Sequence, residues 1–383
     1  MKVVKGIVKG VLFVVAILAA LLAVGTIWNI PVVHSFASYG TIRYAHIFLP
    51  VCVGLLLISA LMLGGKKKAL PILMTILFGA AICLDVVAAG RAVKALRDEG
   101  VRPDLLAAYK KHDFGDVRKE TKNYESSDKE TLLDVYYVDD DKTDKPVLVY
   151  VHGGGWISGT REYHAYTLRT LARNGYVAVS ADYDLSDKEH HYADSVETQL
   201  TRAFAWVKEH IAEYGGKGTE VYVLGDSAGG NLALDVAYKI NGGVYVKAGD
   251  VVLPKIKGVC ALYPVADPAA YYANDELLYK KYAQTSSTYY VGATPEENPA
   301  AYAAITPKNY LSADAPATLF IVGEGDTVAD PQWSYDLSDL LQKNGTRTRV
   351  VSVPYANHAF DYSDGNFGSE AVNALMLAFF GEE

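Results

Sequence analysis

Three long apolar stretches occupy most of the first ninety residues. They run over about 10–29, 44–65 and 69–89, and the first contains no charged residue. Roughly 20 helical residues, at about 1.5 Å each, cross a hydrocarbon core of about 30 Å. The third stretch holds Asp85, which we expect near a membrane interface or facing neighbouring helices rather than as a working intramembrane carboxylate. The pattern predicts a membrane region over 1–92, with three spans in a lipid bilayer.

A different pattern begins after residue 118. Short β-rich runs alternate with helical runs, which is typical of a mostly parallel sheet flanked by helices. Strands are predicted at 119–125, 132–138, 146–151, 177–181, 221–224, 256–262, 317–322 and 347–353. Helices are predicted at 163–174, 194–214, 228–239 and 370–380, with a hairpin turn at 137–142. We therefore expect a connector at 93–118 and an α/β catalytic domain over 119–383.

Charge divides the chain at nearly the same place. Residues 1–100 carry 10 Lys and Arg against 3 Asp and Glu, and subtraction from the totals of 36 and 44 leaves 26 against 41, a net charge of −15. Nucleic acid is not expected as a partner of so acidic a domain, since binding a phosphate backbone needs clustered cations. The three cysteines are spaced for neither a disulfide framework nor a thiol–metal site.

The basic residues also predict an orientation. Six lysines precede the first span or lie between the second and third: Lys2, Lys5, Lys9, Lys66, Lys67 and Lys68. By the positive-inside rule these two segments are cytoplasmic, so three spans place the α/β domain on the extracytoplasmic side of the cell membrane. The basic residues after the third span, at 91, 94, 97 and 102, run against that rule.

A glycine-rich turn joins the predicted strand at 221–224 to the next predicted helix. Its sequence, Gly225-Asp226-Ser227-Ala228-Gly229, is the G-x-S-x-G pattern between a strand and a helix. Such a turn exposes the serine at the strand tip, and the small residues on either side let backbone pass closely. The helix that follows aims free N–H groups at the charge that develops on a substrate carbonyl. We expect Ser227 to be a nucleophile, the alternative being an unreactive glycine turn.

A second glycine run follows the strand at 146–151. His152-Gly153-Gly154-Gly155-Trp156 leaves backbone N–H groups unshielded by side chains, as an oxyanion site requires, although such a run also suits a flexible turn. We interpret His152 as a residue that fixes the loop, because it lies before the glycines. The serine still needs a base and an acid, which should follow later strands in the order acid, then histidine. Asp326 and His358 fit this order, with Glu324 and Asp330 as rival acids.

Over about residues 130–383 the chain resembles the α/β-hydrolase fold and, within it, the hormone-sensitive-lipase-like carboxylesterases. The resemblance rests on both glycine motifs, on Tyr263-Pro264, on residues 323–330 and on His358-Ala359-Phe360. It implies a triad of Ser227, Asp326 and His358, with an oxyanion hole formed by the N–H groups of Gly154, Gly155 and Ala228. The chain departs from the family at Tyr183-Asp184-Leu185, where relatives have an arginine and a following Pro-Glu turn. N-terminal capping helices also have no obvious counterpart.

The tyrosine-rich insertion, Asp267–Leu311, holds eight tyrosines that either line a pocket or fill partly buried space. The leading hypothesis is a membrane-anchored serine ester hydrolase that acts through an acyl-enzyme on a small or polymer-borne ester, without a cofactor or metal. The alternatives are acyl transfer, amide or peptide cleavage on the same fold, and a non-catalytic ligand sensor.

Overall fold

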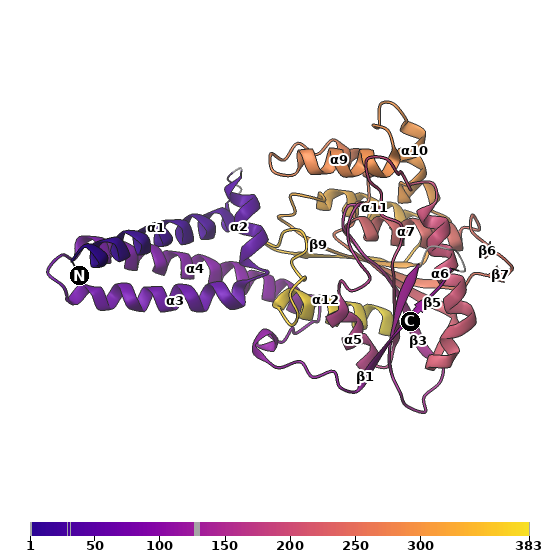
Figure 1. The fold of residues 1–383 in the computed structure, drawn as a ribbon, viewed down its shortest axis with the longest axis horizontal. Helices are drawn as coiled ribbons and strands as arrows, with labels where there is room; N and C mark the ends of the chain where they lie inside the picture. The colour runs from indigo at the N-terminus through magenta and orange to yellow at the C-terminus, as the bar shows by residue number, and fades with distance from the viewer. Residues whose placement is uncertain (1, 29, 31, 126–130, 383) are drawn as a thin grey trace. The chain divides into compact units, whose positions relative to one another are not determined.

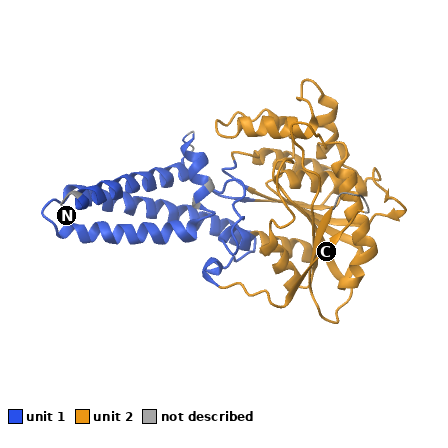
Figure 2. Ribbon diagram, viewed as in Figure 1, with its two compact units in different colours: residues 1–110, 323–326, 352–371 blue, residues 111–322, 327–351, 372–383 orange. Residues whose placement is uncertain are grey.

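The computed structural model describes residues 2–28, 30, 32–125 and 131–382. They form two compact units (Figure 2). The helical unit comprises 1–110, 323–326 and 352–371, and the sheet unit comprises 111–322, 327–351 and 372–383. The helical unit thus includes two short segments from the C-terminal half of the chain. These segments carry two of the residues that the sequence predicts to be catalytic, Asp326 and His358.

The helical unit is built on an apolar bundle. Its elements are α1 (Lys2–Ile27), α2 (Val33–Thr41), α3 (Ala45–Leu61), α4 (Ala69–Asp98) and the 3₁₀ turns η1 (Met62–Gly64) and η2 (Ala107–Tyr109). Helices α1 and α3 both pack against α4. Three helical segments, Val4–Ile27, Ala45–Gly64 and Ala69–Asp98, are long and apolar enough to cross a membrane. The small side chains of Ala16, Ala23 and Ala81 are buried at the centre and allow this close packing.

Two details of this unit differ from the sequence prediction. Helix α4 continues past residue 89 to Asp98, because the charges that end the apolar stretch are carried by good helix formers. Helix α2, in the loop between the first two spans, was not predicted. Asp85 lies on the side of α4 that is buried against neighbouring helices, one of the two positions left open by the sequence.

An eight-stranded sheet organises the second unit (Figure 1). Its strands are β1 (Val117–Asn123), β2 (Leu132–Val138), β3 (Lys145–Val151), β4 (Val177–Ala181), β5 (Gly216–Asp226), β8 (Lys255–Leu262), β9 (Ala317–Gly323) and β10 (Thr348–Val353). Their order is β1-β2-β4-β3-β5-β8-β9-β10. Strands β4, β3, β5, β8 and β9 run parallel, whereas β2 pairs antiparallel with β1 and β4. The mostly parallel sheet confirms the predicted fold class.

Helices cover both faces of the sheet, which is buried through its centre. One face packs against α6 (Val196–His210), α7 (Ser227–Asn241) and α11 (Pro331–Lys343), with Val149, Val223 and Phe204 in the shared core. The other face meets α5 (Ala165–Arg173), which contacts β2 and β4, and α12 (Phe367–Gly381), whose Phe380 packs on Tyr222 of β5. Burial on both faces explains why the central strands are continuous apolar runs rather than alternating ones.

All eight predicted strands are present, but the predicted hairpin turn at 137–142 is wrong. β4 lies between β2 and β3, so these two consecutive strands are not neighbours. The tyrosine-rich insertion folds into α8 (Pro268–Tyr272), α9 (Lys280–Val291), α10 (Pro299–Ala304) and the 3₁₀ turn η4 (Pro307–Tyr310). The remaining elements are η3 (Ile211–Tyr214) and the short pair β6 (Lys247–Ala248) and β7 (Val251–Val252).

Candidate active site

Ser227 lies at the junction between β5 and α7, in a left-handed backbone conformation with φ of 55°. A non-glycine residue in this region is strained and persists only where its surroundings fix it. A Cβ atom on Gly225 would lie 2.3 Å from the Gly229 carbonyl oxygen, and one on Gly229 would lie 2.3 Å from the carbonyl oxygens of Val151 and His152. Only glycine fits both positions, so the sequence builds the sharp turn that the pattern requires.

Helix α7 begins at this serine, so the positive end of its dipole lies next to Ser227. It runs for 15 residues from Ser227, and Ala228 is fully buried in its first turn. The first N–H groups of a helix have no partner within the helix and carry the positive end of its dipole. The Ala228 N–H is one of these groups, in the first turn directly after Ser227.

The glycine loop follows β3 and adopts an unusual backbone path. Gly154, Gly155 and Trp156 have φ values of 120°, 63° and 61°. A Cβ atom on Gly154 would lie 2.0 Å from the Ser158 carbonyl oxygen. The backbone path of this loop therefore requires glycine at position 154.

Asp226 ties the glycine loop to the serine turn. Its buried Oδ1 accepts a hydrogen bond from the Gly153 N–H at 2.9 Å and another from the Tyr150 hydroxyl at 2.7 Å. A carboxylate that accepts two buried hydrogen bonds is a strong anchor. The role of Tyr150 was not predicted, because an aromatic residue within a buried strand looks like ordinary core.

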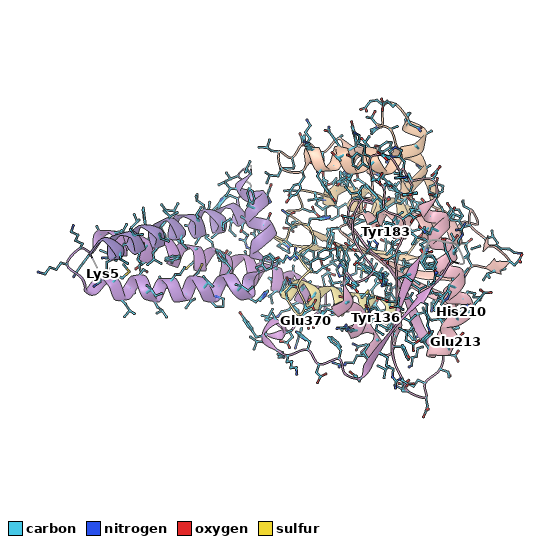
Figure 3. The ribbon with its side chains drawn as sticks, in the orientation of Figure 1. Lys5, Tyr136, Tyr183, His210, Glu213 and Glu370 are labelled. Carbon is cyan, nitrogen blue, oxygen red and sulfur yellow. The ribbon has the colours of Figure 1, made fainter. Side chains whose placement is uncertain are left out.

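His152 packs inside the loop. Its ring stacks on Tyr183, with centroids 4.2 Å apart, and its Nδ1 lies 2.8 Å from the Gly153 carbonyl oxygen. The hydroxyl of Tyr183, a residue labelled in Figure 3, donates to the His152 carbonyl oxygen at 2.7 Å. Burial lowers the pKa of His152 below its ordinary value, which favours the neutral imidazole. The ring stacking and the two hydrogen bonds around His152 thus fix the backbone at the start of the glycine loop.

The tyrosine-rich insertion contacts the glycine loop through Trp156. The Trp156 and Tyr290 rings stack at 4.8 Å, and Tyr271 meets Trp156 edge-on at 5.9 Å. Tyr271, Tyr290 and Tyr302 are almost completely buried, so part of the insertion is core. The Tyr282 hydroxyl approaches the loop from α9, 2.6 Å from the position that a Cβ on Gly155 would take.

The predicted acid and base form a pair within the helical unit. Asp326 follows β9 and His358 follows β10, and His358 Nδ1 lies 2.8 Å from Asp326 Oδ2. Both side chains are largely buried, and burial strengthens a hydrogen bond. The rival acid Asp330 instead caps α11, where its Oδ1 accepts from the Gln332 N–H at 2.9 Å.

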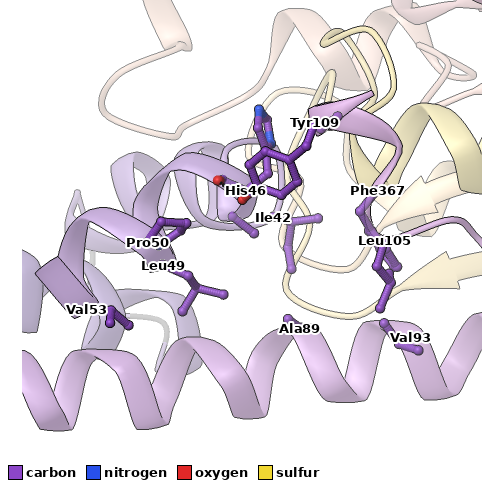
Figure 4. Close-up of a pocket in the computed structure, with 12 residues that line it drawn as sticks. Ile42, His46, Leu49, Pro50, Val53, Ala89, Val93, Leu105, Tyr109 and Phe367 are labelled. Atoms are coloured by element: carbon purple, nitrogen blue, oxygen red, sulfur yellow. Dashed lines mark hydrogen bonds between the residues drawn. The ribbon is translucent and has the colours of Figure 1, made fainter. Parts of the chain in front are cut away.

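A separate cavity of about 420 Å³ lies among α3, α4 and the segment around η2 (Figure 4). It is lined almost entirely by apolar side chains, including Leu49, Val93, Leu105 and Phe367. None of its lining residues is a candidate catalytic residue. Among the described residues, no group of three His, Cys, Asp or Glu side chains is placed to hold a metal ion.

Comparison with known proteins identifies the family. Residues 133–341, more than half of the chain, match the family model BD-FAE. Esterase LipQ of Mycobacterium tuberculosis is 27% identical over 265 residues, covering 67% of this chain and 62% of LipQ. The gibberellin receptor GID1B of Arabidopsis thaliana is 28% identical over 235 residues, covering 58% of this chain and 62% of the receptor. The chain therefore spans less than two thirds of the length of these curated relatives.

The solved structures agree on the fold. Esterase B from Lactobacillus rhamnosis superposes with a TM-score of 0.60 at 22% identity, covering 78% of this chain and 96% of that one. Its α/β-hydrolase fold matches the mostly parallel sheet found here. The chain is a member of the BD-FAE family and has the α/β-hydrolase fold.

Proposed function

We propose that this protein is a serine ester hydrolase in which Ser227 is the nucleophile, His358 the general base and Asp326 its partner. The observation that carries the proposal is the hydrogen bond between His358 Nδ1 and Asp326 Oδ2 at 2.8 Å. That bond commits Nδ1 and fixes the orientation of the imidazole, as the base of a serine nucleophile requires. The esterase names of relatives such as LipQ support the same reaction class.

The sheet topology also supports the proposal. Ser227 follows β5 and Asp326 follows β9, two parallel strands with β8 between them in the sheet order. Parallel strands end at the same edge of a sheet, where α/β folds place their ligands. The glycine loop follows β3, the other neighbour of β5.

The reaction proceeds in two half-steps. His358 Nε2 takes the Ser227 hydroxyl proton as Oγ attacks the ester carbonyl, and the N–H groups of Gly154, Gly155 and Ala228 bind the resulting oxyanion. Collapse expels the alcohol, protonated by His358, and leaves an acyl-enzyme. Water then attacks in the same manner and releases the free acid. The substrate is a small or polymer-borne ester.

Membrane anchoring through the three apolar helices is part of the proposal, with the α/β domain on the extracytoplasmic side. An odd number of spans places the loop between the first two spans and the C-terminal domain on the same side. That loop contains α2, which hydrogen-bonds to the segment around His358. This contact requires both segments to share one side, and reporter fusions at the N-terminus and at the C-terminus test the assignment.

A non-catalytic sensor is the second candidate, since one relative is named a receptor. The test is hydrolysis of nitrophenyl esters from acetate to palmitate by the full-length protein in detergent, beside Ser227→Ala. The proposal expects turnover that the variant lacks. An acyl transferase would divert product to a new ester when an alcohol acceptor is added. Absence of turnover at every chain length, in a folded protein, would contradict the proposal and favour the sensor.

A further inference from the structure

Helix α2 is a short helix between the first two apolar spans, and it folds back closely on α1. A Cβ atom on Gly25 would lie 2.6 Å from Val33 Cγ1, so glycine permits this approach. His34 Nδ1 lies 2.9 Å from the Gly25 carbonyl oxygen. These contacts fix α2 relative to the end of α1.

Ser38 of α2 reaches the segment that carries the proposed base. Its Oγ donates to the His34 carbonyl oxygen at 2.6 Å, and the same oxygen accepts from Asn357 Nδ2 at 2.8 Å. Ser38 and Asn357 are each only 1% exposed. Because its proton is committed to His34, the Ser38 hydroxyl presents a lone pair to Asn357, which makes this a directional contact.

The Asn357 side chain bonds both to Ser38 and to the backbone of His358, and so connects α2 to the acid–base pair. Its Oδ1 accepts from the His358 backbone N–H at 2.6 Å, and His358 in turn meets Asp326 at 2.8 Å. Helix α2 also approaches the acid: a Cβ on Gly325 would lie 2.9 Å from His34 Nε2, and the Gly325 N–H donates to the Ala356 carbonyl oxygen at 2.8 Å. One turn of α2 therefore contacts both catalytic segments.

The segment around His358 is strained. Tyr355 and Ala359 have φ values of 61° and 54°, each a left-handed conformation in a residue with a side chain. Such residues are strained and persist only when surrounding contacts impose their conformation. The Arg91 side chain donates to the Tyr355 hydroxyl, and Asn366 Nδ2 donates to the Arg43 carbonyl oxygen at 3.1 Å. The helical region therefore holds this segment at both ends as well as at Asn357.

We propose that Asn357 is a positioning residue that links Ser38 of α2 to His358, so that the N-terminal helical region orients the acid–base pair. The inference rests on the proposed function. It gives the membrane region a role in catalysis beyond anchoring, since a soluble enzyme of this fold would have to support His358 by other means. A small displacement of a catalytic group is enough to lower the rate strongly.

The test uses full-length protein in detergent with the variants Ser38→Ala, Ser38→Thr and Asn357→Ala. The matched control is Ser59→Ala, which removes an equally buried hydroxyl that bonds to Thr75 in the bundle. We expect kcat for a short nitrophenyl ester to fall about tenfold in Ser38→Ala and Asn357→Ala, with KM little changed. Ser38→Thr keeps the hydroxyl and should restore the rate.

Two outcomes would overturn the inference while leaving the proposed function intact. One is a wild-type kcat in Ser38→Ala and Asn357→Ala, and the other is an equal loss of kcat in Ser59→Ala. A wild-type protein that hydrolyses no ester and takes up no phosphonate would overturn the proposed function and this inference together.

Discussion

The buried carboxylate of Asp226 accepts a hydrogen bond from the Gly153 N–H at 2.9 Å, and so joins the residue before the nucleophile to the start of the glycine loop. The Tyr150 hydroxyl donates to the same oxygen at 2.7 Å. The two backbone segments that would bind an oxyanion are therefore held together by one side chain. This relationship explains why both motifs keep a fixed geometry although together they contain five glycines.

Replacing Asp226 with alanine should loosen the glycine loop. Both hydrogen bonds are lost, at a cost of about 1.5–3 kcal/mol each for bonds to a charged acceptor. Misplaced oxyanion donors should lower kcat by about 10²-fold. Asp226→Asn keeps an oxygen that can accept both bonds and should retain most of the activity. Thermal unfolding and steady-state kinetics measure the two effects, and equal activity of the alanine variant and the wild type would contradict this role.

Two substitutions of Ser227 should both abolish turnover but differ in stability. The φ of Ser227 is 55°, a left-handed conformation that glycine adopts without strain. A residue with a Cβ atom is destabilised there by about 1–2 kcal/mol. Ser227→Gly should therefore unfold at a higher temperature than Ser227→Ala, the reverse of the order expected within a helix. A more stable alanine variant would show that the turn is not strained.

Tyr290 should tolerate loss of its hydroxyl but not of its ring. The ring stacks on Trp156, whereas its hydroxyl is buried and has no hydrogen-bond partner in the described part of the chain. Tyr290→Phe should thus be neutral or stabilise by about 1 kcal/mol, because an unsatisfied buried polar group is removed. Tyr290→Ala leaves a cavity and should cost about 3–5 kcal/mol. Comparable destabilisation by both variants in thermal melts would contradict this account.

Ionisation of Asp235 at high pH should lower the free energy of unfolding of the sheet unit. It is completely buried in α7, and desolvation raises its pKa well above the ordinary 3.8, with Glu197 raising it further and Lys239 opposing. Because the pKa of Asp235 is raised in the folded state, the folded protein binds this proton more tightly than the unfolded chain does. The resulting stabilisation is complete below the ordinary pKa of 3.8 and is lost as the pH rises through the raised pKa of the folded state. Asp235→Asn resembles the protonated acid and should reduce the loss of unfolding free energy toward alkaline pH. An identical pH dependence in both proteins would contradict the prediction.

Much of the fold could be predicted from local patterns. Buried strands such as β3 and β9 are continuous apolar runs, and the turn at Ser227 is defined by its own glycines. The order of strands could not be predicted, and the expected turn between β2 and β3 was wrong because β4 inserts between them. Helix α2 contains Ser, His and Gly residues, which are weak helix formers, so it carries little local signal.

Part of the candidate site could likewise be predicted from local motifs, and part could not. Ser227, Asp326 and His358 could be proposed because each follows a strand with a recognisable motif. The contact between Ser38 and Asn357 joins residues 319 positions apart, and neither residue lies in a motif that points to the other. Tyr150 and Tyr183 resemble core residues in the sequence, and only the hydrogen bonds of their hydroxyl groups reveal a role in holding the turn and the glycine loop.

The most direct measurement of the central claim is covalent labelling of the full-length protein with an alkyl phosphonate, followed by peptide mapping. Phosphonates react with a serine only when a base and an oxyanion site activate it. We predict one label per chain, on the peptide containing Ser227, and no label in Ser227→Ala or His358→Ala. Label on another residue, or none on a folded wild-type protein, would contradict the assignment of Ser227 as the nucleophile.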